Sequence, residues 1–474
     1  MGNLHQQRPA NFLGFAAALL FGASQLVAQP PVPPHETGDG KSDPPLVEPI
    51  ILKHEWAVLS VAYSADARLI AASASPSAKS SVRLWEAATG KLLWDAHFDT
   101  PTYDIAFSPD ATMLACASGP GTVRLVDAAN GKELSVLRHS ERGAVSSVAF
   151  SPDGKWLVST GEGLIVWDVR SRKPHRSLAG EERWTASGAF SPDGKTFACV
   201  FRLMDNERGP AKVHFWQTER WLESNQLADE GTNVLGRIQF SPDGRSLMCS
   251  SKEGLRIYDL ASKAVALDHK DPRKLFNSTN GVFSPDGNLV IVLGSAWSPC
   301  CIIESATGVQ VQVLARGRHN YTHACFSPDG RAVALGSAHH YVAIQPLLPS
   351  SRGLTSANLK PDEMDSLWRD LGSNDVLKRY LATWTLGAAS EEGVGFIAGR
   401  LAAKGAHLDV VTMRSALRAL ELAGTPSARQ ALEGVAETAT EPMIAREARD
   451  ASKRSKARER ISTRAETPPG SNIK

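Results

Sequence analysis

The tetrapeptide Ser-Pro-Asp-Gly returns at nearly constant intervals through the first two thirds of this chain, and it limits the possible fold more than any other feature. Intact copies begin at Ser151, Ser191, Ser241, Ser284 and Ser327, and degenerate copies begin at Ser64 and Ser108. Successive copies start 44, 43, 40, 50, 43 and 43 residues apart, and an aromatic residue precedes each one. A unit of this length cannot bury an apolar face alone, so neighbouring units must pack into one continuous structure.

Each repeat predicts four strands. In the third copy, residues 145–150 alternate small and large side chains, which is the period of a strand. Ser-Pro-Asp-Gly then forms a tight turn, because Pro sets φ at its second position and Gly accepts a positive φ at its end. A second strand over 156–160 and a third over 164–168 follow, and a polar turn leads to an outer strand. Seven such units predict an all-β seven-bladed propeller.

The repeat also resembles the WD40 family. The Trp-Asp pair that names the family stands at Trp167 and Asp168 and is degenerate in other copies, such as Trp85-Glu86. A His precedes the first strand at His54, His97 and His139. The resemblance covers residues 50–349. It implies a protein-binding propeller in which the His joins a hydrogen-bonded network with a strand Ser and the Trp, formed by His54, Ser73 and Trp85 and by His139, Ser159 and Trp167.

Ring closure is a further expectation. Ile50–Lys53 precedes the first inner strand, while the last repeat ends near Pro349 without an outer strand of its own. In WD40 propellers the N-terminal strand completes the last blade, which leaves few exposed sheet edges.

The N-terminus predicts export. Arg8 precedes an apolar run from Phe12 to Phe21 and small residues, so residues 1–28 are interpreted as a signal peptide cut near Ala28, with an uncleaved anchor as the alternative. Residues 29–49 are rich in Pro and form a linker before the propeller at 50–349. The body of the protein is expected to be periplasmic, secreted or envelope-associated.

The repeat stops after a linker over 350–360, and helix signals begin. Pro361, Ser373 or Asn374, Ser390, Asp409, Thr425-Pro426 and Glu441-Pro442 are the predicted starts of six helices, and Gly424 ends the fourth. We therefore expect a smaller all-α, HEAT-like domain over 361–462 and a disordered tail over 463–474. This arrangement is similar to helical tails on some bacterial WD40 proteins.

No catalytic, metal or cofactor site is predicted. Loop histidines lack Asp, Glu or Cys at ligand spacing, and neither a phosphate loop nor a Gly-x-Ser-x-Gly turn occurs. Four of the six cysteines, Cys116, Cys199, Cys249 and Cys325, fit strand positions as small hydrophobes, but Cys300 or Cys301 could reach Cys325. Residues 86–94, ending at Trp94, resemble the tryptophan-docking motif of quinoprotein propellers, which those enzymes repeat and this chain does not.

Binding is expected on the loops opposite the Ser-Pro-Asp-Gly turns, because loops on a rigid scaffold usually carry recognition. The candidate partner-binding residues are Trp56, Trp184, Asp205, Glu207, Arg208 and Trp297. A net charge of +2 does not favour nucleic acid, and membrane contact is expected only through an uncleaved signal or the basic C-terminal helix.

These observations favour a non-catalytic protein–protein interaction scaffold whose partner is another protein. Two alternatives remain: a propeller enzyme or quinoprotein-like cofactor binder, and an envelope structural protein that assembles with itself through its helices.

Overall fold

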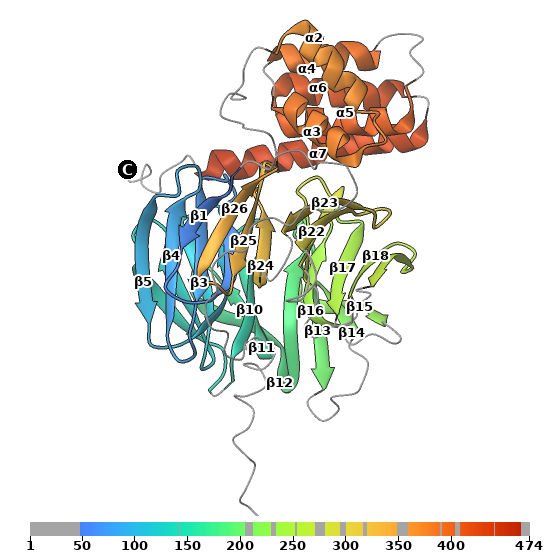
Figure 1. Cartoon of the computed structure of the whole chain (residues 1–474). Coiled ribbons are helices and arrows are strands. Elements are labelled where there is room, and N and C mark those ends of the chain that lie inside the picture. Colours follow the sequence, from blue (N-terminus) through green and yellow to red (C-terminus); the bar gives the residue numbers. More distant parts are fainter. Residues whose placement is uncertain are drawn as a thin grey trace, which may run out of the picture.

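The computed structural model describes residues 48–465, except for 142, 204–211, 229–233, 252–253, 271–279, 294–299, 316–319, 348–358, 389–390, 403–407 and 440. A ring of antiparallel sheets carries a compact group of helices over one of its faces (Figure 1). This is the predicted seven-bladed propeller followed by a smaller helical domain, so the predicted fold class is confirmed.

The strands follow the repeat, and each blade begins with its innermost strand. Blade one contains β2 (Val58–Tyr63), β3 (Leu69–Ala74), β4 (Ser80–Glu86) and β5 (Leu92–Phe98). Blade two contains β6 (Thr102–Phe107), β7 (Met113–Ser118), β8 (Thr122–Asp127) and β9 (Glu133–Arg138). Blade five contains β16 (Val234–Phe240), β17 (Ser246–Ser251), β18 (Gly254–Asp259) and β19 (Val265–Lys270). Blade six contains β20 (Asn280–Phe283), β21 (Leu289–Leu293), β22 (Cys300–Glu304) and β23 (Gln310–Ala315).

Blades three and four share one continuous sheet. It contains β10 (Val145–Phe150), β11 (Trp156–Asp168), β12 (Lys173–Phe190), β13 (Thr196–Leu203), β14 (Lys212–Gln217) and β15 (Leu222–Ala228). The first half of β11 pairs with β10 and its second half pairs with β12, while the second half of β12 pairs with β13. The strands predicted separately over 156–160 and 164–168 are therefore consecutive parts of β11, and β12 is both the outer strand of blade three and the inner strand of blade four.

Blade seven closes the ring. It contains β24 (Tyr321–Phe326), β25 (Ala332–Ser337), β26 (Tyr341–Pro346) and β1 (Ile50–Lys53). Strand β1 pairs with β26 from Ile50 opposite Ile344 to Lys53 opposite Tyr341, so the predicted closure is confirmed. Leu52 is 2% exposed within a core shared with Val342, whereas the neighbouring Ile51 is 49% exposed, as the alternation of a strand requires.

The Ser-Pro-Asp-Gly turns owe their repetition to hydrogen bonds. In each of the seven copies the Ser hydroxyl donates to the Asp carboxylate two residues later. The same hydroxyl accepts the N–H of the first residue of the next strand, such as Trp156 at 2.8 Å from Ser151. The Ser and Asp therefore connect both strands of the hairpin, and this explains why the degenerate copies keep them while losing Pro or Gly.

The helical domain contains α2 (Pro361–Asp370), α3 (Val376–Gly387), α4 (Glu391–Ala402), α5 (Val410–Ala423), α6 (Pro426–Thr438) and α7 (Pro442–Ala465). Asp409 and Thr425 cap α5 and α6 as predicted, and Gly424 ends α5 with a left-handed φ of 66°. The predicted cap of the second helix is wrong by one or two residues: Asp375, not Ser373 or Asn374, accepts the N–H groups of Leu377 and Lys378. None of the described helices is long and apolar enough to span a membrane.

Candidate functional site

Blade three contains the hydrogen-bonded network that the WD40 resemblance implies. His139 Nδ1 lies 2.7 Å from Ser159 Oγ, and Trp167 Nε1 donates to that same oxygen at 2.8 Å. The imidazole Nε2 lies 3.1 Å from the carbonyl oxygen of Glu162. The segment that follows β9 is thereby joined to two parts of β11 through one buried hydroxyl. Asp168 stays outside this network and accepts the N–H of Ser171, a bond that lowers the pKa of its carboxyl.

In blade one the corresponding residues lie together but bond differently. His54 packs edge-on against Trp85, with ring centroids 5.8 Å apart, and its Nδ1 accepts the N–H of Glu55. The hydroxyl of Ser73 is buried and has no hydrogen-bond partner among the described residues. Burial lowers the pKa of both His54 and His139 to about 4, so each is neutral near pH 7.

His97, the third His at this position of the repeat, does not join such a network among the described residues. It lies on the outer strand β5 with a side chain that is 55% exposed, and its Nε2 lies 3.1 Å from Glu55 Oε2. The physical reason is position along the outer strand. His97 lies inside β5, whereas His54 and His139 come directly after the ends of β1 and β9. His97 instead supports Trp56, whose ring stands edge-on at 6.1 Å.

Of the six predicted partner-binding residues, Trp56 alone has a described side chain, and it is half-buried. Trp184 lies on β12, in register with Glu162 on one side and Arg202 on the other, but its side chain lies outside the description. Asp205, Glu207, Arg208 and Trp297 lie outside the described residues.

A ring of polar side chains that the sequence reasoning missed lines the centre of the propeller. Each member stands on an inner strand, three residues before the aromatic residue of its repeat; the members are Ser60, Asp104, Ser147, Ser187, Arg237, Asn280 and His323. Four of them accept a backbone N–H from the next blade: Ser60 from Ile105, Asp104 from Val148, Ser187 from Ile238 and His323 from Val61. The position three residues before the aromatic residue is polar in all seven repeats, and this pattern in the sequence could have revealed the ring.

Two members of the ring form an ion pair across it. Arg237 of blade five donates to Asp104 of blade two, which also accepts a hydrogen bond from Ser60 at 2.9 Å. Blades two and five are not neighbours, so the pair bridges the central channel. The Asp104 side chain is 6% exposed and the Arg237 side chain 36% exposed. Burial and the charge of Arg237 hold the pKa of His323 well below its usual range.

The helical domain sits on the Ser-Pro-Asp-Gly face of blades five to seven, which is the face opposite the predicted recognition loops (Figure 1). Tyr380 and Trp384 of α3 belong to the same apolar core as Leu289, Val333 and Leu335 of the propeller. The Tyr380 hydroxyl donates to the carbonyl oxygen of Gly330 at 2.9 Å. A Cβ on Gly330 would lie 2.4 Å from the Trp384 ring, so the turn of blade seven and the helix are closely fitted.

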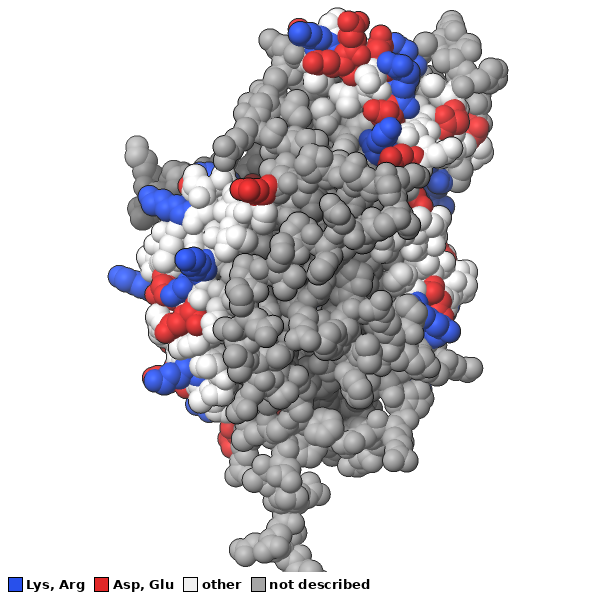
Figure 2. All heavy atoms as spheres, viewed as in Figure 1, with Lys and Arg blue, Asp and Glu red and all other residues white. Residues whose placement is uncertain are grey.

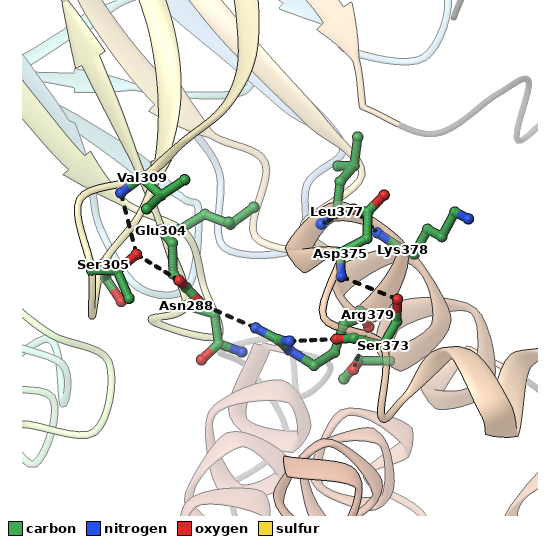
Figure 3. A network of polar contacts seen from close by, with 12 residues as sticks. Asn288, Glu304, Ser305, Val309, Ser373, Asp375, Leu377, Lys378 and Arg379 are labelled. Atoms are coloured by element: carbon green, nitrogen blue, oxygen red, sulfur yellow. Dashed lines mark hydrogen bonds and ion pairs between the residues drawn. The ribbon is translucent and has the colours of Figure 1, made fainter.

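Ion pairs surround this core. Arg379 lies between the propeller and its own helix, 2.9 Å from Glu304 Oε1 and 2.6 Å from the carbonyl oxygen of Ser373 (Figure 3). Arg245, in the blade-five turn, donates to Glu447 at 3.2 Å and to Asp450 at 3.0 Å on α7. Arg418 of α5 donates to the carbonyl oxygen of Pro285. Basic and acidic side chains also alternate over the described surface of the helical domain (Figure 2).

A groove of about 680 Å³ opens where α7 passes over blades four and five. Its floor is apolar and mostly buried, formed by Phe215, Leu227, Phe240 and the half-buried Leu260. Its walls carry hydroxyl, amide and charged groups from blades four and five and from α7; these include Thr196, Ser224, Asn225, Asp193, Lys195, Asp243, Lys263, Arg446, Asp450 and Lys453. Neither the propeller nor the helical domain alone makes this concave surface.

The cysteines contribute no reactive thiolate to the described surface. All six are free, and Cys325 therefore makes no disulfide with Cys300 or Cys301. Burial raises the pKa of Cys116 and Cys325 to about 12 and that of Cys301 to about 11. No three His, Cys, Asp or Glu residues gather to hold a metal ion in the described part of the chain.

Trp94 donates to the carbonyl oxygen of Ala128 at 2.9 Å and so links blades one and two.

Comparison with known proteins agrees with the repeat. The family described as WD domain, G-beta repeat matches residues 49–86, 90–127 and 131–168. Protein tipD of Dictyostelium discoideum is 24% identical over 277 residues, which is 50% of this chain and 44% of that protein. The target of rapamycin complex subunit wat1 of Schizosaccharomyces pombe is 25% identical over 177 residues, 36% of this chain and 54% of that protein.

The nuclear distribution protein nudF of Emericella nidulans is 36% identical over 81 residues, 17% of this chain and 18% of that protein. The chain thus spans about half the length, or less, of these relatives. Each matched repeat contains the outer strand of one blade followed by the inner strands of the next, and the third match contains His139 and the Trp-Asp pair. The chain is a seven-bladed β-propeller that carries WD40 repeats in its first three blades and a smaller helical domain after its last.

Proposed function

We propose that this protein is a non-catalytic scaffold that binds another protein. The observation that carries the proposal is the groove at the junction of α7 with blades four and five, a preformed concave surface built by two parts of the chain that are packed together through a buried core. Binding sites of this kind are typically concave and largely preformed. Wat1, one of the relatives, is named as a subunit of a complex, which supports a role in protein association.

We further propose that the loop face around Trp56 is a second binding surface. Trp56 is held by His97, and His97 by Glu55, so the indole is positioned by a polar support. Aromatic side chains positioned in this way are frequent anchors of protein interfaces. The proposed surface extends to Trp184, Asp205, Glu207, Arg208 and Trp297, as the order of loops along the repeat predicts.

The proposal includes export from the cytoplasm and a HEAT-like helical domain. Arg8, the apolar run and the small residues before Ala28 support a signal peptide, and N-terminal sequencing of the native protein tests it; an intact Met1 on a cytoplasmic protein would contradict it. The HEAT-like arrangement is supported by six helices in which neighbours such as α2 and α3, or α6 and α7, pack against one another.

The scaffold function is tested by affinity capture with the tagged full chain from envelope extracts of the source cells, followed by mass spectrometry. Proteins that the wild type retains and the Trp56→Ala variant does not retain identify the loop face as a binding surface. Trp94→Ala is the matched control, because Trp94 links two blades and lies outside that face. If the wild type retains no protein above the level of an unrelated propeller, the scaffold function is wrong.

A further inference from the structure

The groove under α7 carries more positive charge than its own carboxylates balance. Asp450 is paired with Arg245 at 3.0 Å. Asp193 and Asp243 each accept a turn Ser hydroxyl and the following N–H, so these carboxylates are held within the turns. Asp193 and Asp243 still line the groove, but Oδ1 of each is engaged in its turn, and the five lining cations (Lys195, Arg245, Lys263, Arg446 and Lys453) outnumber the three lining carboxylates.

The cations of the groove are freer than its anions. Lys195 and Lys453 are exposed and have no ion-pair partner among the described residues, and Arg446 lies 3.9 Å from the already paired Asp450. Lys263 donates a hydrogen bond to the neutral side chain of Asn225, which does not balance its positive charge. These cations come from blade four, blade five and α7, so they lie on different sides of the apolar floor of the groove.

The floor differs in chemistry from the walls. Phe215, Leu227 and Phe240 are 5–7% exposed, and Leu260 is half-buried between them and solvent. Thr196, Ser224 and Asn225 add hydroxyl and amide groups that can bond to peptide N–H and C=O groups. A volume of about 680 Å³ exceeds what an inorganic anion fills and lies within the range of sites for ligands with several functional groups.

We propose that this groove binds an acidic peptide segment of a partner protein, with apolar side chains on the Phe215–Phe240 floor and carboxylates facing Lys195, Arg446 and Lys453. This inference rests on the proposed scaffold function and names the chemistry of its partner. Because the site needs both domains, binding requires that α7 stays docked through Arg245. Charge complementarity at an exposed rim sets the association rate and salt dependence, so binding should weaken as salt rises.

The test uses the full chain and a fluorescein-labelled octapeptide, Glu-Glu-Leu-Glu-Glu-Phe-Glu-Glu, with fluorescence anisotropy as the readout. We expect the double substitution Lys195→Glu and Lys453→Glu to weaken binding by about tenfold or more. Lys155→Glu is the control, because Lys155 holds the same position in the turn of blade three and lies outside the groove. The peptide with Gln in place of every Glu should bind more weakly than the acidic one.

Because charge reversal could disturb α7, Lys195→Gln with Lys453→Gln is measured beside it, and thermal unfolding verifies that both variants are folded. Equal peptide binding by the wild type and both folded double variants would overturn the proposal. So would equal binding of the Gln peptide, or binding of anionic phosphatidylglycerol vesicles through these lysines with no peptide binding.

The two proposals fail differently. If the wild type captures proteins from the extract and the double variant captures the same proteins equally, the scaffold function stands, but the groove is not the surface that binds those proteins. If the wild type captures none, the scaffold function itself is wrong, while the peptide measurement still decides the chemistry of the groove.

Discussion

Tyr380 donates its buried hydroxyl to the carbonyl oxygen of Gly330, 50 residues earlier in the chain, and this bond joins α3 to the last Ser-Pro-Asp-Gly turn. Burial raises the pKa of Tyr380 well above its usual range, so the phenol is protonated and can donate at neutral pH. The helical domain is therefore packed into the propeller and shares its core.

Gly330→Ala should separate the stability of the turn from that of the domain contact. At Gly154 and Gly330 alike the φ is positive, 72° and 68°, so Ala is strained by about 1–2 kcal/mol at either site. The added Cβ would be 3.8 Å from Pro109 at Gly154 but 2.4 Å from the Trp384 ring at Gly330. We expect Gly330→Ala to cost at least about 2 kcal/mol more than Gly154→Ala. Urea unfolding followed by tryptophan fluorescence measures both, and equal midpoints would contradict the fitted contact.

Leu52→Asp should open the ring, while Ile51→Asp should not. Leu52 is 2% exposed on the closing strand, and its neighbour Ile51 is 49% exposed on the same strand. Removing the buried side chain and placing a carboxylate in its position should cost about 3–5 kcal/mol. The Ile51 variant should stay within about 1 kcal/mol of the wild type. Thermal melting and light scattering compare them, and similar melting temperatures would show that β1 contributes little to closure.

Stability should fall as pH falls from 6.5 towards 4. The pKa of His139 is about 4 in the folded protein and 6.5 in the unfolded chain, so the unfolded state binds more protons throughout that window. The stabilisation is fully present above pH 6.5 and is lost progressively on the way to pH 4, by about 3 kcal/mol for this histidine.

His139→Gln should reduce this pH dependence, because Gln does not titrate. Its unfolding free energy, measured in urea at half-unit steps from pH 7.5 to 4.5, should decrease less steeply than that of the wild type. Parallel curves would mean that His139 is not the neutral, buried group of the blade-three network. His54, with the same pKa of about 4, should retain its share of the slope in this variant.

The Asp104–Arg237 pair should stabilise the fold through the hydrogen bonds of Asp104 as well as through charge. Asp104→Asn keeps one oxygen that can accept the N–H of Val148, and its NH2 group can donate to the Ser60 hydroxyl, whereas Asp104→Ala removes both groups and leaves a buried N–H without an acceptor. We expect the Ala variant to be about 1–3 kcal/mol less stable than the Asn variant. Asp99→Ala, at an exposed position, is the control and should change stability by less than about 0.5 kcal/mol. If Asn and Ala are equally destabilising, the inter-blade bonds contribute nothing measurable.

Much of the fold was predictable because it depends on short-range chemistry. A Ser and an Asp two residues apart, followed by a strand, specify the same hairpin wherever they recur, and alternation along Ile50–Lys53 determines which side chains face the core. The caps at Asp409 and Thr425 are equally local, since each side chain bonds an N–H three residues onward. The His of blade three was predictable because its Ser and Trp partners lie within one repeat.

The remaining features depend on which distant surfaces meet. Tyr380 and Trp384 have the spacing of any apolar helix face, and nothing in that spacing distinguishes a helical core from the turn of blade seven. Asp104 and Arg237 are 133 residues apart, and only the closed ring places them across one channel. The groove likewise exists because Arg245 is held by Glu447 and Asp450, about 200 residues away, which positions α7 over two blades. Local hydrogen bonding thus determined the blades from the sequence alone, whereas the fit of side chains between distant elements, which no periodicity encodes, decided where this protein presents a binding surface.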